Sequence, residues 1–308
     1  MTDGPNLTPT ALVTQSRKAP WSALTVAGKR VTEFSIIKRN FVRNPGAMAG
    51  LFSMAALVLI AGLADLVAPY DPLEQTRAFL QPPSWEHPFG TDPLGRDILS
   101  RVIHGARTSL SVGVGAVFVA MFIGFVVGVT GGYFGKRIDA FVVMVVDTFM
   151  SFPGILLAMV IVSMFGNTLP VVMLAVGLGE FTLFARLIRS VVYAEKERDY
   201  ILASRSLGAG PLFIILSHIL PNILGPLIVL ITVSIGNAIL AAAALGFLGL
   251  GAQPPLPEWG TLVNSGREYI QIAPWLVWFP GLAIMVTVLS ANLLGDGLRD
   301  ALDPKLRR

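Results

Sequence analysis

The chain contains no cysteine, only three histidines and few charged residues, and each shortage excludes a class of function. The lack of cysteine rules out disulfides, thiolate metal sites and thiol nucleophiles. His87, His104 and His218 are far apart in the sequence, and no nucleophile stands beside a base. We therefore expect neither a metal site nor catalysis, and no cofactor bound by this chain.

The sequence also lacks a P-loop for nucleotide hydrolysis and a basic, aromatic stripe for nucleic-acid binding. The nearest approach to a P-loop has Thr130 where the first glycine should stand and Arg137 after Lys136. Basic residues border apolar segments instead of forming a stripe with interleaved aromatics, so the net charge of +4 does not indicate a nucleic-acid partner. The chain is expected neither to hydrolyse a nucleotide nor to bind DNA or RNA.

Long apolar segments dominate what remains. Hydrophobic residues make up 54% of the 308 residues, charged residues 14%, and the mean hydropathy is +0.69, which lies outside the usage of soluble proteins. A membrane-spanning helix needs about 20 mostly apolar residues. The sequence predicts an all-α polytopic membrane protein with six spans, at 47–68, 108–131, 140–165, 170–188, 224–250 and 276–295.

The distribution of lysine and arginine predicts the orientation, because cytoplasmic loops carry an excess of both. Six spans place the two termini on one side, and all but five of the 23 basic residues fall on that side. The first 46 residues also lack a signal-peptide pattern. We therefore expect both termini in the cytoplasm of a multi-pass cell-membrane protein.

These spans divide the chain into four regions. A cytoplasmic tail covers 1–46 and the first span 47–68. An extracytoplasmic loop follows at 69–107, whose end reads as an amphipathic helix leading into the second span, and a core of five spans covers 108–308. The second outer loop, at 251–274, either shares an outer docking surface with the first or anchors the chain through Trp259 and Trp275 at the level of the lipid headgroups, and we expect anchoring.

The segment 194–222 places a short charged helix between two spans. Asp199 is predicted to cap a helix over 200–207, and Gly208 suits the left-handed conformation that ends it. Tyr200, Ala203 and Leu207 share one face. A helix this short is not stable alone in water, so it either inserts into a groove of a soluble subunit or lies on the membrane surface.

Three motifs identify a family resemblance. Leu202-Ala203-Ser204, Gly208 and His218-Ile219-Leu220-Pro221 match the spacing of the EAA loop of ABC importer permeases, with departures at 202, 204 and 218. The other motifs are HPFGTDPLGRDILSRVIHGARTSL (87–110) and the pair AAALGFLGLGAQPPLPEWG (242–260) and ANLLGDGLRDALDP (291–304). Over residues 36–308 the chain resembles the C-type permease subunit of dipeptide and oligopeptide importers.

The resemblance implies a type I ABC importer transmembrane domain. It implies a homologous second permease, two cytoplasmic P-loop ATPases that use ATP and Mg²⁺, an extracytoplasmic binding protein and surrounding membrane lipid as partners. The loop at 69–107 would either dock the binding protein or only support the bundle. The residues that the resemblance seats in the ATPase are Tyr200, Ala203, Ser204, Arg205, Leu207, Gly208, Leu220 and Pro221.

Polar residues inside the predicted spans are candidates for the translocation path or for a partner contact, because ionisable groups in hydrocarbon are costly. Asp147 stands where the family often has aspartate, which favours a structural or gating contact near the cytoplasmic side. Glu180 stands where the family more often has small or polar residues, so it either meets a cationic amino group in the path or pairs with the partner subunit. Asn237 joins this group.

The sequence also allows a different class of transporter and other cargoes. A proton-coupled secondary transporter would use Asp147 and Glu180 as proton sites and would show inverted repeats and broken helices; no repeat is evident in the sequence. Within the importer family, the cargo could also be a nickel chelate, glutathione or an oligosaccharide.

Overall fold

The structure is a computed structural model that describes residues 25–26, 29–30, 33–253 and 255–302. Two short strands, β1 (Thr25–Val26) and β2 (Lys29–Arg30), pair antiparallel, and the other regular elements of the described chain are helical. Most of the predicted tail at 1–46 and the last six residues lie outside the described residues. Within the tail, helix α1 (Glu33–Arg43) precedes the first long helix.

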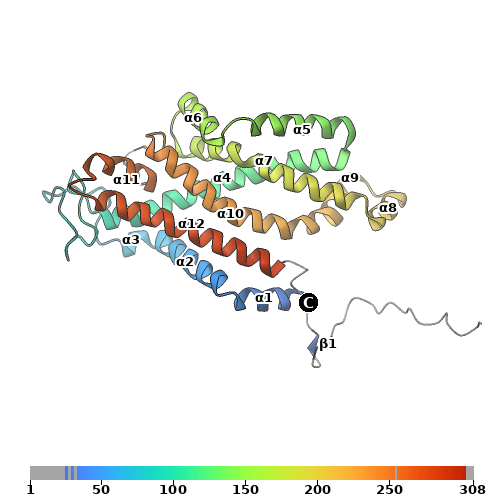
Figure 1. Cartoon of the computed structure of the whole chain (residues 1–308), viewed down its shortest axis with the longest axis horizontal. Helices are drawn as coiled ribbons and strands as arrows, with labels where there is room; N and C mark the ends of the chain where they lie inside the picture. Colours follow the sequence, from blue (N-terminus) through green and yellow to red (C-terminus); the bar gives the residue numbers. More distant parts are fainter. Residues whose placement is uncertain (1–24, 27–28, 31–32, 254, 303–308) are drawn as a thin grey trace, which may run out of the picture.

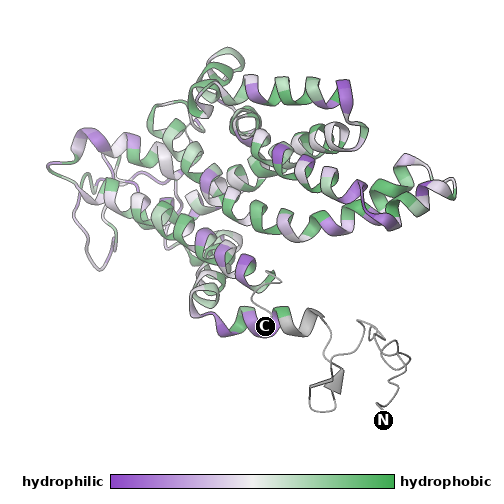
Figure 2. Ribbon diagram, turned by 45° about the vertical axis from the view of Figure 1, so that its right-hand side comes forward, coloured by the Kyte–Doolittle hydropathy of each residue, from purple (hydrophilic) through white to green (hydrophobic). Residues whose placement is uncertain are grey.

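Five helices are long and apolar enough to cross a membrane, and they run side by side in Figure 1. In chain order they are α2 (Pro45–Gly62), α4 (Ile98–Phe134), α7 (Leu169–Lys196), α10 (Leu220–Phe247) and α12 (Trp275–Leu302). Helix α10 continues α9 (Pro211–Ile214) and the π-helix η1 (Ile215–Ile219). Apolar residues predominate along these helices (Figure 2), and large apolar side chains such as Phe118, Phe122 and Leu289 are exposed, as expected for helices that face lipid.

The span predicted at 140–165 is not one straight helix but a bent pair of helices. Helix α5 (Lys136–Met150) and helix α6 (Gly154–Phe165) meet at 84°, and together they make one broken segment. The break falls at Ser151, Phe152 and Pro153. Proline offers no backbone N–H and disfavours the helical conformation of the residue before it, so the chain turns there. Counted as one span, the bent pair brings the number of spans to six.

The end of the loop at 69–107 is helical and leads into the second span, as predicted. This amphipathic segment forms the first turns of α4, which begins at Ile98 and runs without a break to Phe134. Asp97 caps this helix by accepting a hydrogen bond from the Ser100 N–H at 2.8 Å. His87 lies 3.0 Å from the same carboxylate. After the short helix α3 (Ala64–Val67), the chain as far as Asp97 forms no further helix.

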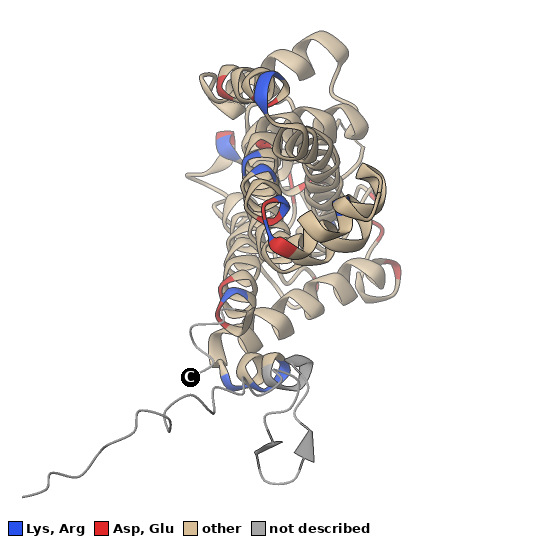
Figure 3. Cartoon of the chain, turned by 90° about the vertical axis from the view of Figure 1, so that its right-hand side faces the viewer, with Lys and Arg blue, Asp and Glu red and all other residues tan. Residues whose placement is uncertain are grey.

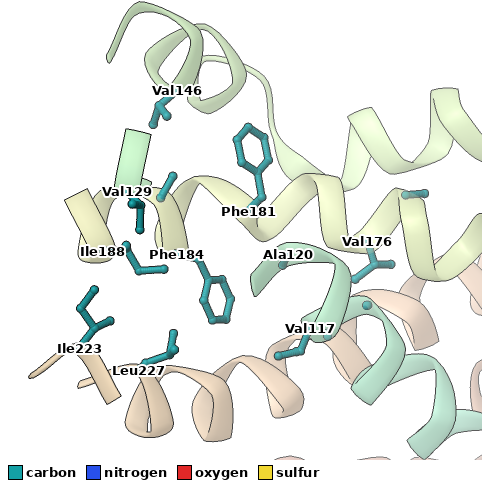
Figure 4. Close-up of a cluster of buried hydrophobic side chains, with 14 of the residues drawn as sticks. Val117, Ala120, Val129, Val146, Val176, Phe181, Phe184, Ile188, Ile223 and Leu227 are labelled. Carbon is teal, nitrogen blue, oxygen red and sulfur yellow. The ribbon is translucent and has the colours of Figure 1, made fainter. Parts of the chain in front are cut away.

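Helices α4 and α7 form the most extensive helix pair of the described chain. Glycines on α4 allow the two backbones to approach: a Cβ at Gly128 would lie 2.7 Å from the carbonyl oxygen of Ala185. Small residues serve this purpose in membrane bundles, where close packing drives helix association. Around this contact gathers a buried apolar cluster that includes Phe184, Ile188 and Leu227 (Figure 4).

The remaining elements lie beside this core. Helix α12 packs against both α2 and α10, and α1 packs against α12. Two short helices, α11 (Trp259–Gly266) and the 3-10 helix η2 (Arg267–Tyr269), close one end of the bundle. Helix α8 (Asp199–Ser206) lies at the opposite end, near which α1 and the end of α12 are also found (Figure 1).

Changing Gly128 to alanine should destabilise the chain by about 1–3 kcal/mol, because the added methyl overpacks the α4–α7 contact. Thermal unfolding in detergent, followed by fluorescence-detected size exclusion, would show a lower midpoint. Gly225→Ala is the matched control, since a Cβ there meets nothing within 4 Å. Equal midpoints for the two variants would contradict the proposed packing.

Candidate functional site

Residues 194–222 form a helical protrusion at one end of the bundle. It contains the end of α7, the short helix α8, a turn, α9 and η1, and it leads into α10. Figure 1 shows α8 beyond the ends of the neighbouring long helices. The view onto this end in Figure 3 shows acidic and basic residues close together. The protrusion therefore offers an accessible surface that carries charged residues and is attached directly to two spans.

Helix α8 begins one residue earlier than predicted, and its cap differs. The N-cap residue is Arg198, which makes no side-chain capping bond, and Asp199 is the first helical residue. The prediction that Asp199 caps the helix was wrong; its carboxylate lies in the first turn, where it favours the helix dipole. Ile201 is fully buried and anchors the eight-residue helix to the bundle, which a helix of this length requires.

Gly208 ends α8 in the left-handed conformation, as predicted. Its φ is +86°, and its N–H donates to the Arg205 carbonyl at 3.0 Å while the next N–H, of Ala209, donates to the Ser204 carbonyl at 3.1 Å. A Cβ at this position would meet nothing within 4 Å. A larger residue would therefore be disfavoured by the backbone conformation and not by lack of space.

Three polar side chains, Glu195, Tyr200 and Asn222, join α8 to the two spans beside it. We call them the junction triangle. The Tyr200 hydroxyl donates to Glu195 Oε1, and Asn222 Nδ2 lies 3.1 Å from both Glu195 Oε1 and the Tyr200 hydroxyl. Arg198 Nε adds an ion pair with Glu195 Oε2 at 3.0 Å. Partial burial, together with the hydrogen bond to Glu195, raises the pKa of Tyr200, so the phenol remains a donor.

His218 lies beneath α8 and supports it. Its Nε2 is 3.4 Å from the Ser204 hydroxyl, and its ring packs edge-on against the rings of Tyr200 and Phe213. In the sequence, His218 stands out only as a departure from the EAA pattern. No sequence motif points to Glu195 or Asn222, because no pattern links a residue at the end of one span to a residue 27 positions later.

The residues predicted to meet a partner differ in exposure. Leu207 is 90% exposed; Tyr200, Ala203, Arg205 and Gly208 are also exposed, and Ser204 is half-buried. Leu220 and Pro221 form the first turn of α10, where Pro221 is exposed. Three apolar side chains that the motif does not include are also exposed on this protrusion. They follow Gly208 closely and are Leu212, Phe213 and Leu216.

The polar residues predicted within the spans are not brought together. Asp147 on α5 forms an ion pair with Arg186 on α7 at 3.2 Å, and both side chains are exposed. Glu180 on α7 lines a small cavity, whose lining includes neither Asp147 nor Asn237. Asn237 is exposed on α10. The structure thus places three separate polar positions along the spans.

The opposite end of the bundle is built around a buried carboxylate and a buried indole. Glu258 accepts the N–H groups of Gly260 and Thr261 at 2.8 and 2.9 Å and so caps α11. Trp259 is only 1% exposed, and its indole donates to the Val102 carbonyl at 2.9 Å. The expectation that Trp259 anchors at the lipid headgroups was wrong, because this ring fills the core between α11 and α4.

Comparison with protein-family models gives two matches. Residues 105–308 match the family described as "Binding-protein-dependent transport system inner membrane component". Residues 33–83 match the "N-terminal TM domain of oligopeptide transport permease C". The first match covers more than half of the chain and contains the whole protrusion.

Several characterised proteins are similar over most of their length. The di/tripeptide transport system permease protein DppC of Pseudomonas aeruginosa is 47% identical over 276 residues, covering 87% of this chain and 91% of the relative. The dipeptide permease DppC of Escherichia coli K12 is 47% identical (87% and 92% covered). The glutathione permease GsiD of Escherichia coli O6:K15:H31 is 44% identical (87% and 89% covered).

Among solved structures, a chain of the methionine ABC transporter MetNI, in an inward-facing conformation, shares the fold. The TM-score is 0.55 at 20% identity, with 67% of this chain and 98% of that chain covered. At this identity the likeness concerns the arrangement of the helices alone.

Changing Asn222 to alanine should loosen α8, because the variant removes the amide that connects α10 to both other members of the junction triangle. Each lost hydrogen bond contributes about 0.5–1.5 kcal/mol, and the variant loses two of them across the triangle, so the amides of α8 should exchange roughly 5- to 150-fold faster. Hydrogen–deuterium exchange in detergent measures this. Ser206→Ala is the control, since that hydroxyl bonds only within α8; equal exchange in both variants would refute the role of Asn222.

Proposed function

The chain belongs to the family of binding-protein-dependent transport system inner membrane components, as a permease subunit of an ABC importer, and we propose that the solute it imports is a peptide. The observation that carries the choice of solute is the 47% identity to a di/tripeptide permease over 87% of the chain. A glutathione permease is nearly as similar. Glutathione is itself a tripeptide derivative, so a small peptide backbone is the chemistry common to both.

The proposed complex contains four further subunits. A homologous permease forms the other half of the pathway, two P-loop ATPases dock at the α8 end, and a binding protein delivers the solute at the α11 end. The chain itself lacks a P-loop. ATP and Mg²⁺ are therefore used by the ATPases, and this subunit is not catalytic and holds no cofactor.

Helix α8 is the proposed coupling element. Its exposed Leu207 and Arg205, with the exposed part of Tyr200, would be seated in a groove of the ATPase. Buried Ile201 and the hydrogen bonds of the junction triangle, which use the Tyr200 hydroxyl, hold the helix to the bundle. Closure of the ATPase dimer would then move α8 together with the ends of α7 and α10. The spans would reorient as rigid bodies, and no chemistry occurs in this chain.

The proposed orientation places the α8 end in the cytoplasm. Lys38, Arg39 and Arg43 of α1 belong to this end, and they support the placement because cytoplasmic segments carry an excess of basic residues. The irregular chain before Asp97 and helix α11 would then face the binding protein. Membrane lipid would surround the outer helix surfaces.

A proton-coupled secondary transporter is not favoured by the family match. The broken α5–α6 segment is a feature that this class also contains, but a broken helix does not distinguish the two mechanisms. Nickel chelates and oligosaccharides remain alternative cargoes that the same assay can test.

The test of the proposed function is uptake by the complex reconstituted in liposomes with its partner subunits and its binding protein. Alanyl-alanine, glutathione, a nickel chelate and an oligosaccharide serve as labelled cargoes. ATP-dependent uptake of a peptide, insensitive to a proton gradient, is the expected result. Gradient-driven uptake without ATP hydrolysis would overturn the importer mechanism, and uptake of only non-peptide cargo would overturn the choice of solute.

Changing Gly208 to valine should uncouple ATP hydrolysis from the solute. A β-branched residue in the left-handed conformation costs on the order of 1–3 kcal/mol, which shifts the end of α8 and reduces solute-stimulated ATPase activity several-fold. Gly210→Ala is the matched control, because Gly210 has a φ of −73° and a Cβ there meets nothing within 4 Å. Unchanged stimulation in the Gly208 variant, at equal assembly, would contradict the coupling role.

A further inference from the structure

A small cavity lies between α6, α7 and α10. Its volume is about 190 Å³, and its lining consists of Gly154, Ile155, Ala158, Val176, Gly179, Glu180, Ala241 and Leu245. Glu180 is the one charged residue in this lining. The other lining residues are apolar side chains or glycines, so the cavity presents a single carboxylate in an otherwise apolar wall.

Glu180 lies near the middle of the membrane. It stands 11 residues beyond the first residue of α7, which is about 17 Å along the helix, roughly half of the hydrocarbon thickness. A carboxylate at this depth is costly unless a partner satisfies it. Its position therefore requires an explanation that packing alone does not give.

The described residues around Glu180 do not fully satisfy its carboxylate. The Oε2 atom of Glu180 is shielded from solvent and makes no hydrogen bond, and the same holds for the Ser234 hydroxyl on α10. The two side chains approach each other but do not meet hydrogen-bonding criteria. The cavity thus contains one unsatisfied acceptor, with an unsatisfied hydroxyl beside it.

Small residues keep this space open. A Cβ added at Gly154 would lie 3.4 Å from the Gly179 carbonyl oxygen, and the reverse distance is the same, so α6 and α7 touch through two glycines. Ala158 and Ala241 complete the wall with methyl groups only. Larger side chains at these positions would fill the cavity, so its volume follows directly from residue size.

We propose that this cavity binds the primary ammonium group of the transported solute, with Glu180 as its acceptor. The inference rests on the proposed peptide function, because every peptide with a free amino terminus carries such a cation. At about 190 Å³ the cavity is smaller than a site for a whole drug-sized ligand, so it takes one end of the solute. A cation neutralises the half-buried carboxylate, and the apolar wall strengthens their attraction.

The experiment compares two cargoes in reconstituted complexes, alanyl-alanine with a free amino group and its N-acetylated form. Glu180→Gln keeps the shape but removes the charge, and uptake of alanyl-alanine should fall about tenfold or more while uptake of the acetylated peptide is unchanged. The same binding protein delivers both cargoes, so its own preference cancels when the variant is compared with the wild type. Asp296→Asn, an exposed carboxylate on α12, is the control and should change neither uptake.

A second variant tests the space independently of the charge. Ala241→Leu fills the cavity and retains Glu180, and it should also reduce uptake of alanyl-alanine. An equal effect of Glu180→Gln on both cargoes, no effect at all, or loss of the second permease during purification would overturn the proposal; the last result would make Glu180 a subunit contact. Failure of the wild-type complex to take up either peptide with ATP would instead overturn the proposed function.

Discussion

The close approach of α4 and α7 is the contact on which the rest of the structure depends. Hydrocarbon offers no hydrogen-bond partners, so each span must satisfy its own backbone as a helix, and lipid gives no hydrophobic drive for helices to associate. Glycines such as Gly128 let the two backbones come close, so that van der Waals packing stabilises the pair instead. Helix α10 then packs on both members of this pair, α12 packs on α10, and α2 packs on α12.

The positions of the spans could be predicted from the sequence because apolar length is a one-dimensional property. The left-handed end of α8 could also be predicted, because it depends on a single residue, Gly208, whose type favours a positive φ. The break at Pro153 carried a local signal in Ser-Phe-Pro-Gly, but the apolar run through it masked the signal. The burial of Trp259 could not be predicted, because it depends on contact with Val102 of α4, 157 residues earlier in the chain.

The candidate site divides in the same way. Motif spacing located α8, yet Glu195 and Asn222 belong to the ends of different spans, and only the fold brings them within 3.1 Å. The same two spans also line the cavity, with Glu180 on α7 and Ala241 on α10. A movement of α8 that changed the separation of α7 and α10 would therefore alter the cavity as well. The coupling surface and the cavity therefore lie on the same pair of helices.

The π-helix η1 has a consequence for helical phase. An α-helix advances about 100° per residue, and a π-turn accommodates one additional residue within the helix. Relative to α10, the side chains of α9 are therefore rotated by roughly 100° from the positions they would have in an uninterrupted α-helix. The single extra residue within 215–219 therefore sets the direction in which the exposed side chains of Leu212 and Phe213 point. That direction is measured relative to the face of α10 that packs in the bundle.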